Sequence, residues 1–436
     1  MSAASLTERL ASRLVRPVPD VARARARLHL LDWLGCVAGG LRSEVAAVAR
    51  AAEPDPVARA ALLGNILEMD DVHRAAILHP GPVVWPAALA AARETGASLG
   101  ALLEAGVRGY EAVIAVGLAL DARHYAHYHS TATAGGFGAA AAAASLFGLA
   151  PAATADALGN WGSVAGGLWR MRHEPVMTKQ FHAAHSALTG LWCARLARAG
   201  LSGPRAILEG EQGLFAATCA APRPMPLDRP GWLIDEVSLK PWGACRHAHP
   251  TIDAALKLPP GALAGDGPIR VATYADALRF CDRPAPASVI EAKFSLQHAV
   301  AVVAVRGRPA LADFEPDAIA DPAIAAVRGR VRVEEDPTLT ARYPVQFGAR
   351  VEAGGMAAEA PNAWGDPEWP LTPEEVQAKA RALFAWGGAD AHAEAALDAA
   401  MQAPDETPVS ALLELVAGLV GGGTVGTGSP AMRSAA

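Results

Sequence analysis

The stretch Asn65-Ile-Leu-Glu-Met-Asp-Asp-Val-His-Arg-Ala-Ala-Ile-Leu-His-Pro-Gly-Pro-Val-Val84 gathers charged groups inside an otherwise apolar part of the chain. We expect a helix over residues 62–69 and a break at Pro80-Gly81-Pro82, because proline removes an amide donor and glycine frees φ. Five titratable side chains precede the break: Glu68, Asp70, Asp71, His73 and His79. On a helix, Glu68 and Asp71 would share a face, as would Asp70 and His73. Taken alone, this pattern is more typical of a polar helix end with solvated charges, so motifs elsewhere must decide its meaning.

The size and composition of the chain indicate a well-packed globular protein. Its 436 residues suffice for two domains, or for one large domain with an insertion, and 52% of them are hydrophobic while 19% are charged. The formal net charge is −6 and no basic block is present, so we expect neither nucleic acid nor a membrane surface as a partner.

The cysteines and the N-terminal residues indicate in which cellular compartment the protein is expected. The five cysteines are odd in number, far apart and contain no Cys-x-x-Cys pair, which argues against a disulfide framework and favours a reducing environment. Residues 1–15 carry Glu8, Arg9 and Arg13 and lack the apolar core of a secretory signal. No run of about 18 large apolar residues is present that could span a bilayer. We therefore expect a soluble cytoplasmic protein.

The first part of the chain is predicted to be all-helical. Apolar residues at three-and-four spacing indicate helices over residues 20–38, 84–93, 98–120 and 177–200, and no convincing strand occurs before about residue 235. The helix that begins at Ser98 contains four glycines, so it has to be stabilised by close packing against its neighbours. Gly136-x-Gly138-x-x-Ala141 superficially matches a dinucleotide-binding fingerprint, but no strand precedes it and no βαβ unit surrounds it. We instead predict a polar loop that leads into a buried, small-residue helix.

The pattern changes near residue 240. Apolar and polar residues alternate over 269–274, 329–334 and 344–352, which indicates half-exposed strands, with a helix over 295–305 between them. Thr372 is predicted to cap a helix over 373–384, with Glu375 in a capping-box position. The predicted fold is therefore mainly α: a large helical domain (1–239, with 371–420 returning to it), a smaller α+β lid domain (240–370) and a loose tail (421–436).

Clustered histidines suggest metal binding, but their spacing does not support it. His124-x-x-His127-x-His129 and Cys245-x-His247-x-His249 both lack the spacing of a zinc site, and no His-Glu-x-x-His helix occurs. We expect no metal and no cofactor, and we place His124 and His127 in a surface loop. The chain also lacks a Gly-x-Ser-x-Gly elbow, a Walker loop and the kinase motifs, which excludes the commonest hydrolases and phosphotransferases.

Other histidines and lysines are better candidates for chemistry. His79, His129 and His249 each lie beside a Pro or Ser/Thr turn that would expose them at a helix end. Lys179, Lys240 and Lys293 with His298 lie in short motifs rich in small residues or turns, although an isolated lysine usually faces solvent. Imidazole titrates near neutral pH, so His79 and His129 are candidates for a proton-transfer pair.

Several motifs occur together and in a fixed order. They are Asn65-Ile-Leu-Glu-Met-Asp-Asp-Val-His with His79-Pro-Gly, Gly109-Tyr-Glu, His129-Ser-Thr-Ala-Thr-Ala-Gly-Gly-Phe-Gly, Lys179-Gln-Phe-His, Leu208-Glu-Gly-Glu-Gln-Gly, Lys240-Pro-Trp with Cys245-Arg-His-Ala-His-Pro, and Ala292-Lys-Phe-Ser-Leu-Gln-His. In this order the chain resembles the MmgE/PrpD family, which includes 2-methylcitrate dehydratase, cis-aconitate decarboxylase and iminodisuccinate epimerase. The resemblance covers nearly the whole chain.

The resemblance implies a homodimer that acts on a small di- or tricarboxylate without a metal, at a site between a helical domain and an α+β lid. Its catalytic positions correspond to Asp70, His79, His129, Lys240 and His298. Substrate-binding positions correspond to Glu68, Lys179, Cys245 and Arg246. In the mechanism we expect, the two lysines hold carboxylates, Glu68 or Asp70 fixes a histidine tautomer, and His298 assists protonation.

Three departures from the family pattern bear on the substrate. Glu68 stands where aspartate is usual, Val72 replaces a threonine, and His298 occupies a position often held by tyrosine. We expect a lyase that hydrates or dehydrates a polycarboxylate. An epimerase, a cis-aconitate-type decarboxylase and a non-catalytic carboxylate-binding protein remain the alternatives.

Overall fold

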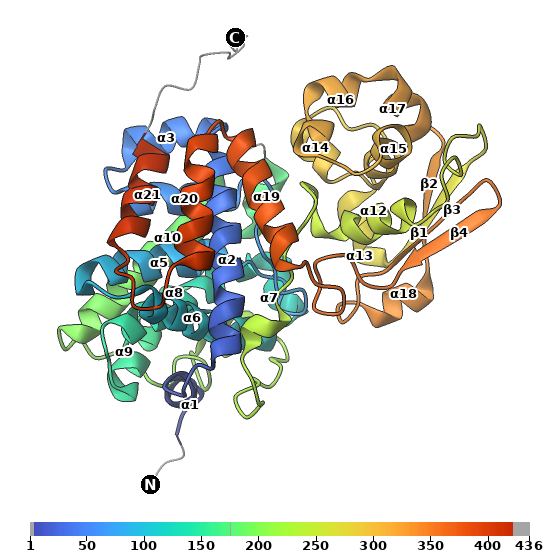
Figure 1. Ribbon diagram of the computed structural model, residues 1–436. Helices are drawn as coiled ribbons and strands as arrows, with labels where there is room; N and C mark the ends of the chain where they lie inside the picture. Colours follow the sequence, from blue (N-terminus) through green and yellow to red (C-terminus); the bar gives the residue numbers. More distant parts are fainter. Residues whose placement is uncertain (1–3, 175, 422–436) are drawn as a thin grey trace, which may run out of the picture.

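The computed structural model describes residues 4–174 and 176–421, which fold around two main hydrophobic cores. Figure 1 places a large helical body beside a smaller part that carries the sheet. The mainly helical fold with a smaller α+β part is therefore confirmed. Among the described residues, none of the helices is both long enough and apolar enough to cross a membrane.

The helical body is built from two separate stretches of the chain. Its elements are α1 (Leu6–Leu14), α2 (Asp20–Gly40), α3 (Glu44–Ala52), α4 (Pro56–Leu63), α5 (Gly81–Thr95), α6 (Leu99–Ala119), α7 (Ala122–His127), α8 (Ser130–Leu146), α9 (Pro151–Gly162), η1 (Trp169–His173), α10 (Thr178–Arg198), α11 (Leu214–Thr218), η2 (Leu233–Glu236), α19 (Pro373–Trp386), η5 (Asp390–His392), α20 (Ala393–Leu397), η6 (Asp398–Gln402) and α21 (Ser410–Gly421). Gly421 ends α21, and the rest of the expected loose tail lies outside the described residues.

Helix α8 is the centre of this body and packs against α5, α6, α9 and α10. Its residues 130–144 are all buried. Small side chains allow this, because helix axes approach closely where no side chain intervenes. A Cβ atom added to Gly138 would lie 2.8 Å from the carbonyl oxygen of Gly109, and one added to Gly109 would lie 2.9 Å from that of Gly138. The close packing predicted for the glycine-containing helix is thus confirmed at the α6–α8 crossing.

Helix α19 returns the chain to the body. Thr372 and Glu375 form the predicted capping box at its start. Helix α19 then runs along α2, as Figure 1 shows in red and blue. The last described helices therefore complete the core that the first 240 residues begin.

The smaller part contains a four-stranded sheet with helices packed on it. Its elements are η3 (Arg246–Ala248), α12 (His249–Leu256), β1 (Ile269–Thr273), α13 (Ala275–Cys281), α14 (Val289–Lys293), α15 (Leu296–Arg306), η4 (Leu311–Phe314), α16 (Pro316–Ala320), α17 (Pro322–Arg328), β2 (Val331–Glu335), α18 (Pro337–Arg342), β3 (Ala349–Ala353) and β4 (Met356–Ala360). The strand order is β2-β1-β3-β4, with β1 and β2 parallel and the other pairs antiparallel.

The three predicted strands are present, and a fourth was not predicted. Strand β4, Met-Ala-Ala-Glu-Ala, has no β-branched residue and does not read as a strand. Its place is fixed by the two-residue turn at Gly354 and Gly355, which both have positive φ, the geometry that joins tightly paired strands. The third strand also begins later than predicted, at Ala349 instead of Pro344.

Two predictions for the helical part are wrong. Helix α4 ends at Leu63, and Glu68 has φ of 60°, so residues 65–69 are not helical and Glu68 cannot share a helix face with Asp71. His124 is not in a surface loop: it lies on α7, fully buried, with Nε2 3.0 Å from the hydroxyl of Thr133. His127, at the end of the same helix, is exposed as expected.

The α6–α8 crossing gives a matched pair of stability tests. We expect Gly138→Ala to lower the free energy of unfolding by about 1–3 kcal/mol, because its methyl group collides with backbone on α6. Gly418→Ala on α21, where the nearest atom to an added Cβ lies at 3.4 Å, should raise it by about 0.5–1 kcal/mol through helix propensity. Urea unfolding of both variants measures the difference. Equal effects would contradict a steric constraint at the crossing.

Candidate active site

The segment between α4 and α5 is held in an irregular path by lysines from distant parts of the chain. Lys293, at the end of α14, donates to the carbonyl oxygen of Leu67 at 3.1 Å. Lys379, on α19, donates to the carbonyl oxygen of Met69 at 2.6 Å. In a helix these carbonyls would accept backbone amides, so the lysines replace the helical hydrogen bonds that the segment lacks.

Asp71 anchors the other end of this segment. Its carboxylate accepts from the ring Nδ1 of His29 at 2.7 Å, the hydroxyl of Tyr110 at 2.5 Å and the backbone N–H of Gly81 at 2.9 Å. All of these groups are buried, and burial lowers the pKa of His29 to about 4. The carboxylate thereby fixes the turn from which α5 starts. Asp71 is a structural residue, since both of its oxygens are occupied by these groups.

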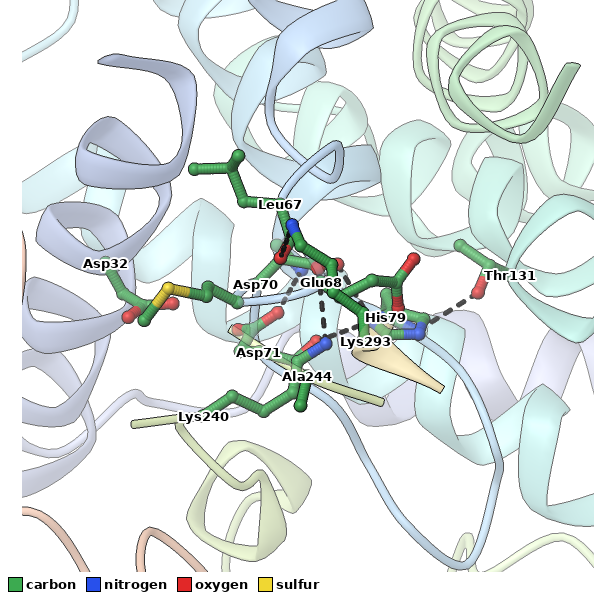
Figure 2. A network of polar contacts seen from close by, with 12 residues as sticks. Asp32, Leu67, Glu68, Asp70, Asp71, His79, Thr131, Lys240, Ala244 and Lys293 are labelled. Carbon is green, nitrogen blue, oxygen red and sulfur yellow. Dashed lines mark hydrogen bonds and ion pairs between the residues drawn. The ribbon is translucent and has the colours of Figure 1, made fainter. Parts of the chain in front are cut away.

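Asp70 lies at the centre of a cluster of charged side chains (Figure 2). One of its oxygens is 2.8 Å from Nδ1 of His79 and the other is 3.3 Å from Nζ of Lys240. Burial alone would raise the pKa of Asp70, but the charges of His79 and Lys240 hold it well below its usual range. Asp70 is therefore a permanent anion that faces a histidine and a lysine.

The same contacts determine the tautomer of His79. Its Nδ1 also lies 3.1 Å from the carbonyl oxygen of Asp71, so both neighbours of Nδ1 are acceptors. Nδ1 must carry a proton, and the neutral ring then has a free electron pair on Nε2. The backbone N–H of His79 donates to the hydroxyl of Thr131 at 3.1 Å, which fixes the residue against the start of α8. This arrangement prepares Nε2 to accept a proton.

Glu68 lies next to this cluster and contacts Lys179. The carboxylate is buried, which would raise its pKa, but the charges of Lys179 and Lys240 lower it overall. Burial would lower the pKa of Lys179, and the charges of Glu68 and Asp70 raise it. Burial lowers the pKa of Lys293, which also lies close enough to feel the charges of Glu68 and Lys240. The cluster thus contains three lysines (Lys179, Lys240 and Lys293) and two carboxylates (Glu68 and Asp70).

His129 borders the cluster from the α8 side. Its ring packs on Trp169 with the ring centroids 4.7 Å apart, and its Nδ1 lies 3.3 Å from Nδ1 of His182. Burial, together with the charges of Lys179 and His79, holds the pKa of His129 well below its usual range. His129 is therefore neutral at neutral pH, unlike the nearby ammonium group of Lys179.

Two other predicted residues, His298 and Arg246, have different surroundings. Both nitrogens of the His298 ring are engaged within the smaller part, Nε2 with the carbonyl oxygen of Asp313 at 2.7 Å and Nδ1 with Arg328 at 3.2 Å. Arg246 forms an ion pair with Asp366, with both distances 2.5 Å, which leaves little of its charge for a substrate. The structure therefore does not bring these two residues into the cluster.

Cys245 and His249 lie at the edge of the cluster. Cys245 is close enough to Glu68 and Lys240 for their charges to act on its thiol, and its backbone N–H donates to the carbonyl oxygen of Lys293 at 2.8 Å. His249 is buried at the start of α12, with Nε2 3.0 Å from the carbonyl oxygen of Ala244. Burial lowers its pKa strongly, with a further effect from Arg246 and Lys240.

Sequence reasoning did not assign roles to Lys293, Lys379 and His182. Lys293 and His182 belong to motifs that were recognised, but a lysine or histidine inside a motif does not reveal where its side chain points. Lys379 carried no signal, because its partners Asp32 and Met69 lie more than 300 residues earlier. In the described part of the chain, no three His, Cys, Asp or Glu side chains are arranged to hold a metal ion.

The cluster is nearly closed to solvent. The side chains of Asp70 and Lys240 are 1% exposed, while those of His79 and Lys179 are 16% and 21% exposed. Solvent therefore reaches the cluster beside the histidine and the lysine that would meet a substrate. This combination of a permanent anion, an oriented imidazole and several ammonium groups can remove a proton next to a carboxylate and stabilise the resulting negative charge.

Parts of the chain are similar in sequence to known proteins. A 2-methylcitrate dehydratase from Cupriavidus necator is 32% identical over 185 residues, which are 39% of this chain and 38% of that protein. The cis-aconitate decarboxylase-like protein oryM of Aspergillus oryzae is 36% identical over 172 residues, 37% of this chain and 36% of that protein. Cis-aconitate decarboxylase of Homo sapiens is 26% identical over 270 residues, 58% of this chain and 56% of that protein. Each match spans less than two-thirds of the relative.

Two family domains cover most of the chain. Residues 58–226 match the MmgE/PrpD N-terminal domain, and residues 242–403 match the MmgE/PrpD C-terminal domain. The first segment contains Glu68, Asp70, His79 and Lys179, and Lys240 falls in the short interval between the two segments. The chain belongs to the MmgE/PrpD family.

Proposed function

We propose that this protein is a lyase that acts on a small di- or tricarboxylate by moving a proton on a carbon next to a carboxylate. The contact chain His79–Asp70–Lys240 carries the proposal. Asp70 orients the imidazole so that Nε2 is free to act as a base, and it holds an ammonium group beside it. The relatives support the reaction class, since their names describe a dehydratase and decarboxylases.

In the proposed mechanism, the lysines compensate for the weakness of the carbon acid. Removal of the proton leaves an enediolate, whose negative charge develops on the carboxylate oxygens. Lys240 is placed to stabilise this charge, while Lys179 holds a second carboxylate of the substrate. His79 and His129 act as the proton-transfer pair, and no step in the proposal requires a metal. Dehydration follows where the neighbouring carbon carries a hydroxyl group, which leaves with the electron pair of the C–O bond. In a decarboxylation, loss of carbon dioxide replaces the removal of the proton: the electron pair of the broken C–C bond forms the enediolate, which the proton-transfer pair then protonates.

Glu68 has a specific place in this proposal. Glu68 contacts Lys179, the residue proposed to hold a substrate carboxylate. A substrate carboxylate would therefore compete with Glu68 for the same ammonium group. Because three lysines face only two carboxylates, the cluster retains an attraction for one further anionic group.

The second candidate function is an epimerase of an aminodicarboxylate-type acid. Two departures from the family pattern favour it: Val72, which replaces a threonine, and His298, which replaces a tyrosine. The tyrosine hydroxyl is absent, and the His298 ring is turned to Asp313 and Arg328. Fewer groups then remain to protonate a leaving group.

The homodimer implied by the resemblance stays a prediction, and sedimentation velocity of the purified protein would test it.

Ligand binding can be tested before the substrate is known. We expect succinate, citrate and cis-aconitate to raise the melting temperature and acetate to have no effect. Bound ligand stabilises the folded state by RT ln(1 + [L]/Kd), about 2.7 kcal/mol at a hundredfold excess over Kd. Lys179→Met should abolish the response, while Lys257→Met should preserve it, because Lys257 is exposed and its contacts are Trp369 and the carbonyl oxygen of Glu359, outside the cluster. A response that persists in Lys179→Met would remove this lysine from the binding site.

Activity tests the proton-transfer pair. His79→Ala and His129→Ala should each lower turnover by about 10²- to 10⁴-fold, the usual contribution of a general acid or base. His127→Ala, which alters an exposed histidine two residues before His129, serves as the control and should retain full turnover. Circular dichroism checks folding. Full turnover in a folded His79→Ala variant would exclude the proposed base.

Product analysis in D₂O separates the candidate reactions. A dehydratase produces an alkene that absorbs in the ultraviolet, and a decarboxylase releases carbon dioxide. An epimerase instead exchanges the proton next to the carboxylate for deuterium without either product. Exchange alone, detected by proton NMR over the same set of acids, would replace the lyase assignment with the epimerase.

A further inference from the structure

His129, which borders the charged cluster, contacts the ring of His182. His129 precedes α8 and His182 lies in the second turn of α10, and their Nδ1 atoms are 3.3 Å apart. Both residues are buried, His129 at 2% exposure and His182 at 9%. Trp169 packs on one ring and the carbonyl oxygen of Gly167 accepts the backbone N–H of His129 at 2.8 Å, so the pair is held in place.

A contact between two Nδ1 atoms makes the tautomers of the two rings dependent on each other. A hydrogen bond at this position needs a proton on one Nδ1 and a free electron pair on the other. If His129 supplies the proton, its Nε2 is unprotonated and can act as a base. If His182 supplies it, neutral His129 must carry its proton on Nε2 and can act as an acid. Burial lowers the pKa of both rings, which keeps both of them neutral between turnovers.

The outer side of His182 opens to solvent. It lines an open cavity of about 520 Å³ together with Gly167, Phe181 and His185. Within residues 4–174 and 176–421, no group hydrogen-bonds the Nε2 atom of His182. His182 therefore lies between a buried histidine at the candidate active site and a cavity that water can enter.

We propose that His182 is a positioning and relay residue that sets the tautomer of His129 and passes protons between it and solvent. The proposal rests on the proposed function and adds a residue to its machinery. In the direction of the reaction opposite to that in which His79 is the base, His129 takes the substrate proton on Nε2 and becomes protonated on both nitrogens. Its Nδ1 proton then passes to Nδ1 of His182, and His182 releases its own Nε2 proton to water in the cavity.

This sequence is balanced and reversible. Both rings end neutral, with His129 protonated on Nε2 and accepting a hydrogen bond from Nδ1 of His182. One proton has moved from substrate to solvent, only N–H, C–H and O–H bonds have changed, and no oxidant or reductant is needed. A proton that enters from water by the reverse path restores the base form of His129. One relay thus prepares the same histidine as base or acid.

Two substitutions at His182 distinguish its two proposed roles, which are to set the tautomer of His129 and to pass protons to solvent. In His182→Asn the side-chain amide can replace Nδ1 as a hydrogen-bond partner but cannot conduct a proton. His182→Ala removes both roles and joins the vacated space to the cavity, where added imidazole can enter. We expect both variants to keep the thermal shift with cis-aconitate and to lose turnover on the order of tenfold or more, below the ~10²–10⁴ of the acid or base itself. Imidazole should restore turnover in His182→Ala and not in His182→Asn.

His185→Ala is the matched control, because this residue lines the same cavity one turn further along α10. It should turn over as fast as the unmodified protein, with or without imidazole. Unchanged turnover in both His182 variants would overturn the relay, as would a loss in folded His182→Ala that imidazole does not restore.

A second measurement does not depend on turnover. Two-bond proton–nitrogen spectra of ¹⁵N-histidine-labelled protein report which ring nitrogen carries a proton, and His129→Gln and His182→Asn assign the two residues. We expect complementary tautomers in the pair and a changed His129 tautomer in His182→Ala. Two rings that both lack a proton on Nδ1 would overturn the inference even if no substrate were found. Absent turnover together with complementary tautomers would instead refute the proposed function alone.

Discussion

The candidate site depends on buried ammonium groups that hold the backbone between Leu67 and Asp70 in a non-helical path. Lys293 and Lys379 donate to carbonyls of this segment, and Lys379 is in turn paired with Asp32 at 2.5 Å. A buried ammonium is stable only where charge and hydrogen bonds compensate for its lost hydration, so each lysine requires its partners in place. The positive φ of Glu68 persists because lysines from two distant helices, α14 and α19, fix the residues on either side of it.

Two buried aspartates, Asp32 and Asp70, have different roles because their neighbours shift their pKa values in opposite directions. Asp32 and Asp70 each face a lysine, yet burial raises the pKa of Asp32 to about 6 while the charges around Asp70 depress its pKa. The difference follows from the neighbours: Asp70 contacts both His79 and Lys240, whereas Asp32 contacts one lysine and lies close enough to Asp71 and Asp70 for their negative charges to raise its pKa. Asp70 therefore stays ionised throughout the neutral range and can orient His79 continuously. Asp32 instead serves to neutralise Lys379, which secures the backbone beside the site.

The sequence predicted those features of the fold that are determined by interactions between residues close together in the chain. The start of α6 at Ser98, the cap at Thr372 and the close packing of the glycines of α6 follow from neighbouring residues, and the structure has them where expected. The turn at Glu68 and the strand β4 could not be predicted in the same way. The first is stabilised by lysines more than 200 residues away, and the second by pairing with β3 after a Gly-Gly turn. The order of the motifs identified the cluster residues, but not that the His298 ring is engaged with Asp313 and Arg328.

The two histidines of the proposed proton-transfer pair differ in a way that suits them to different tasks. His79 has both neighbours of its Nδ1 as acceptors, so its tautomer is fixed and Nε2 is always the reactive atom. His129 faces another imidazole, so its tautomer can change with a single proton transfer. In the proposed mechanism, a fixed base and a switchable partner supply both proton removal and proton return without rearranging the cluster.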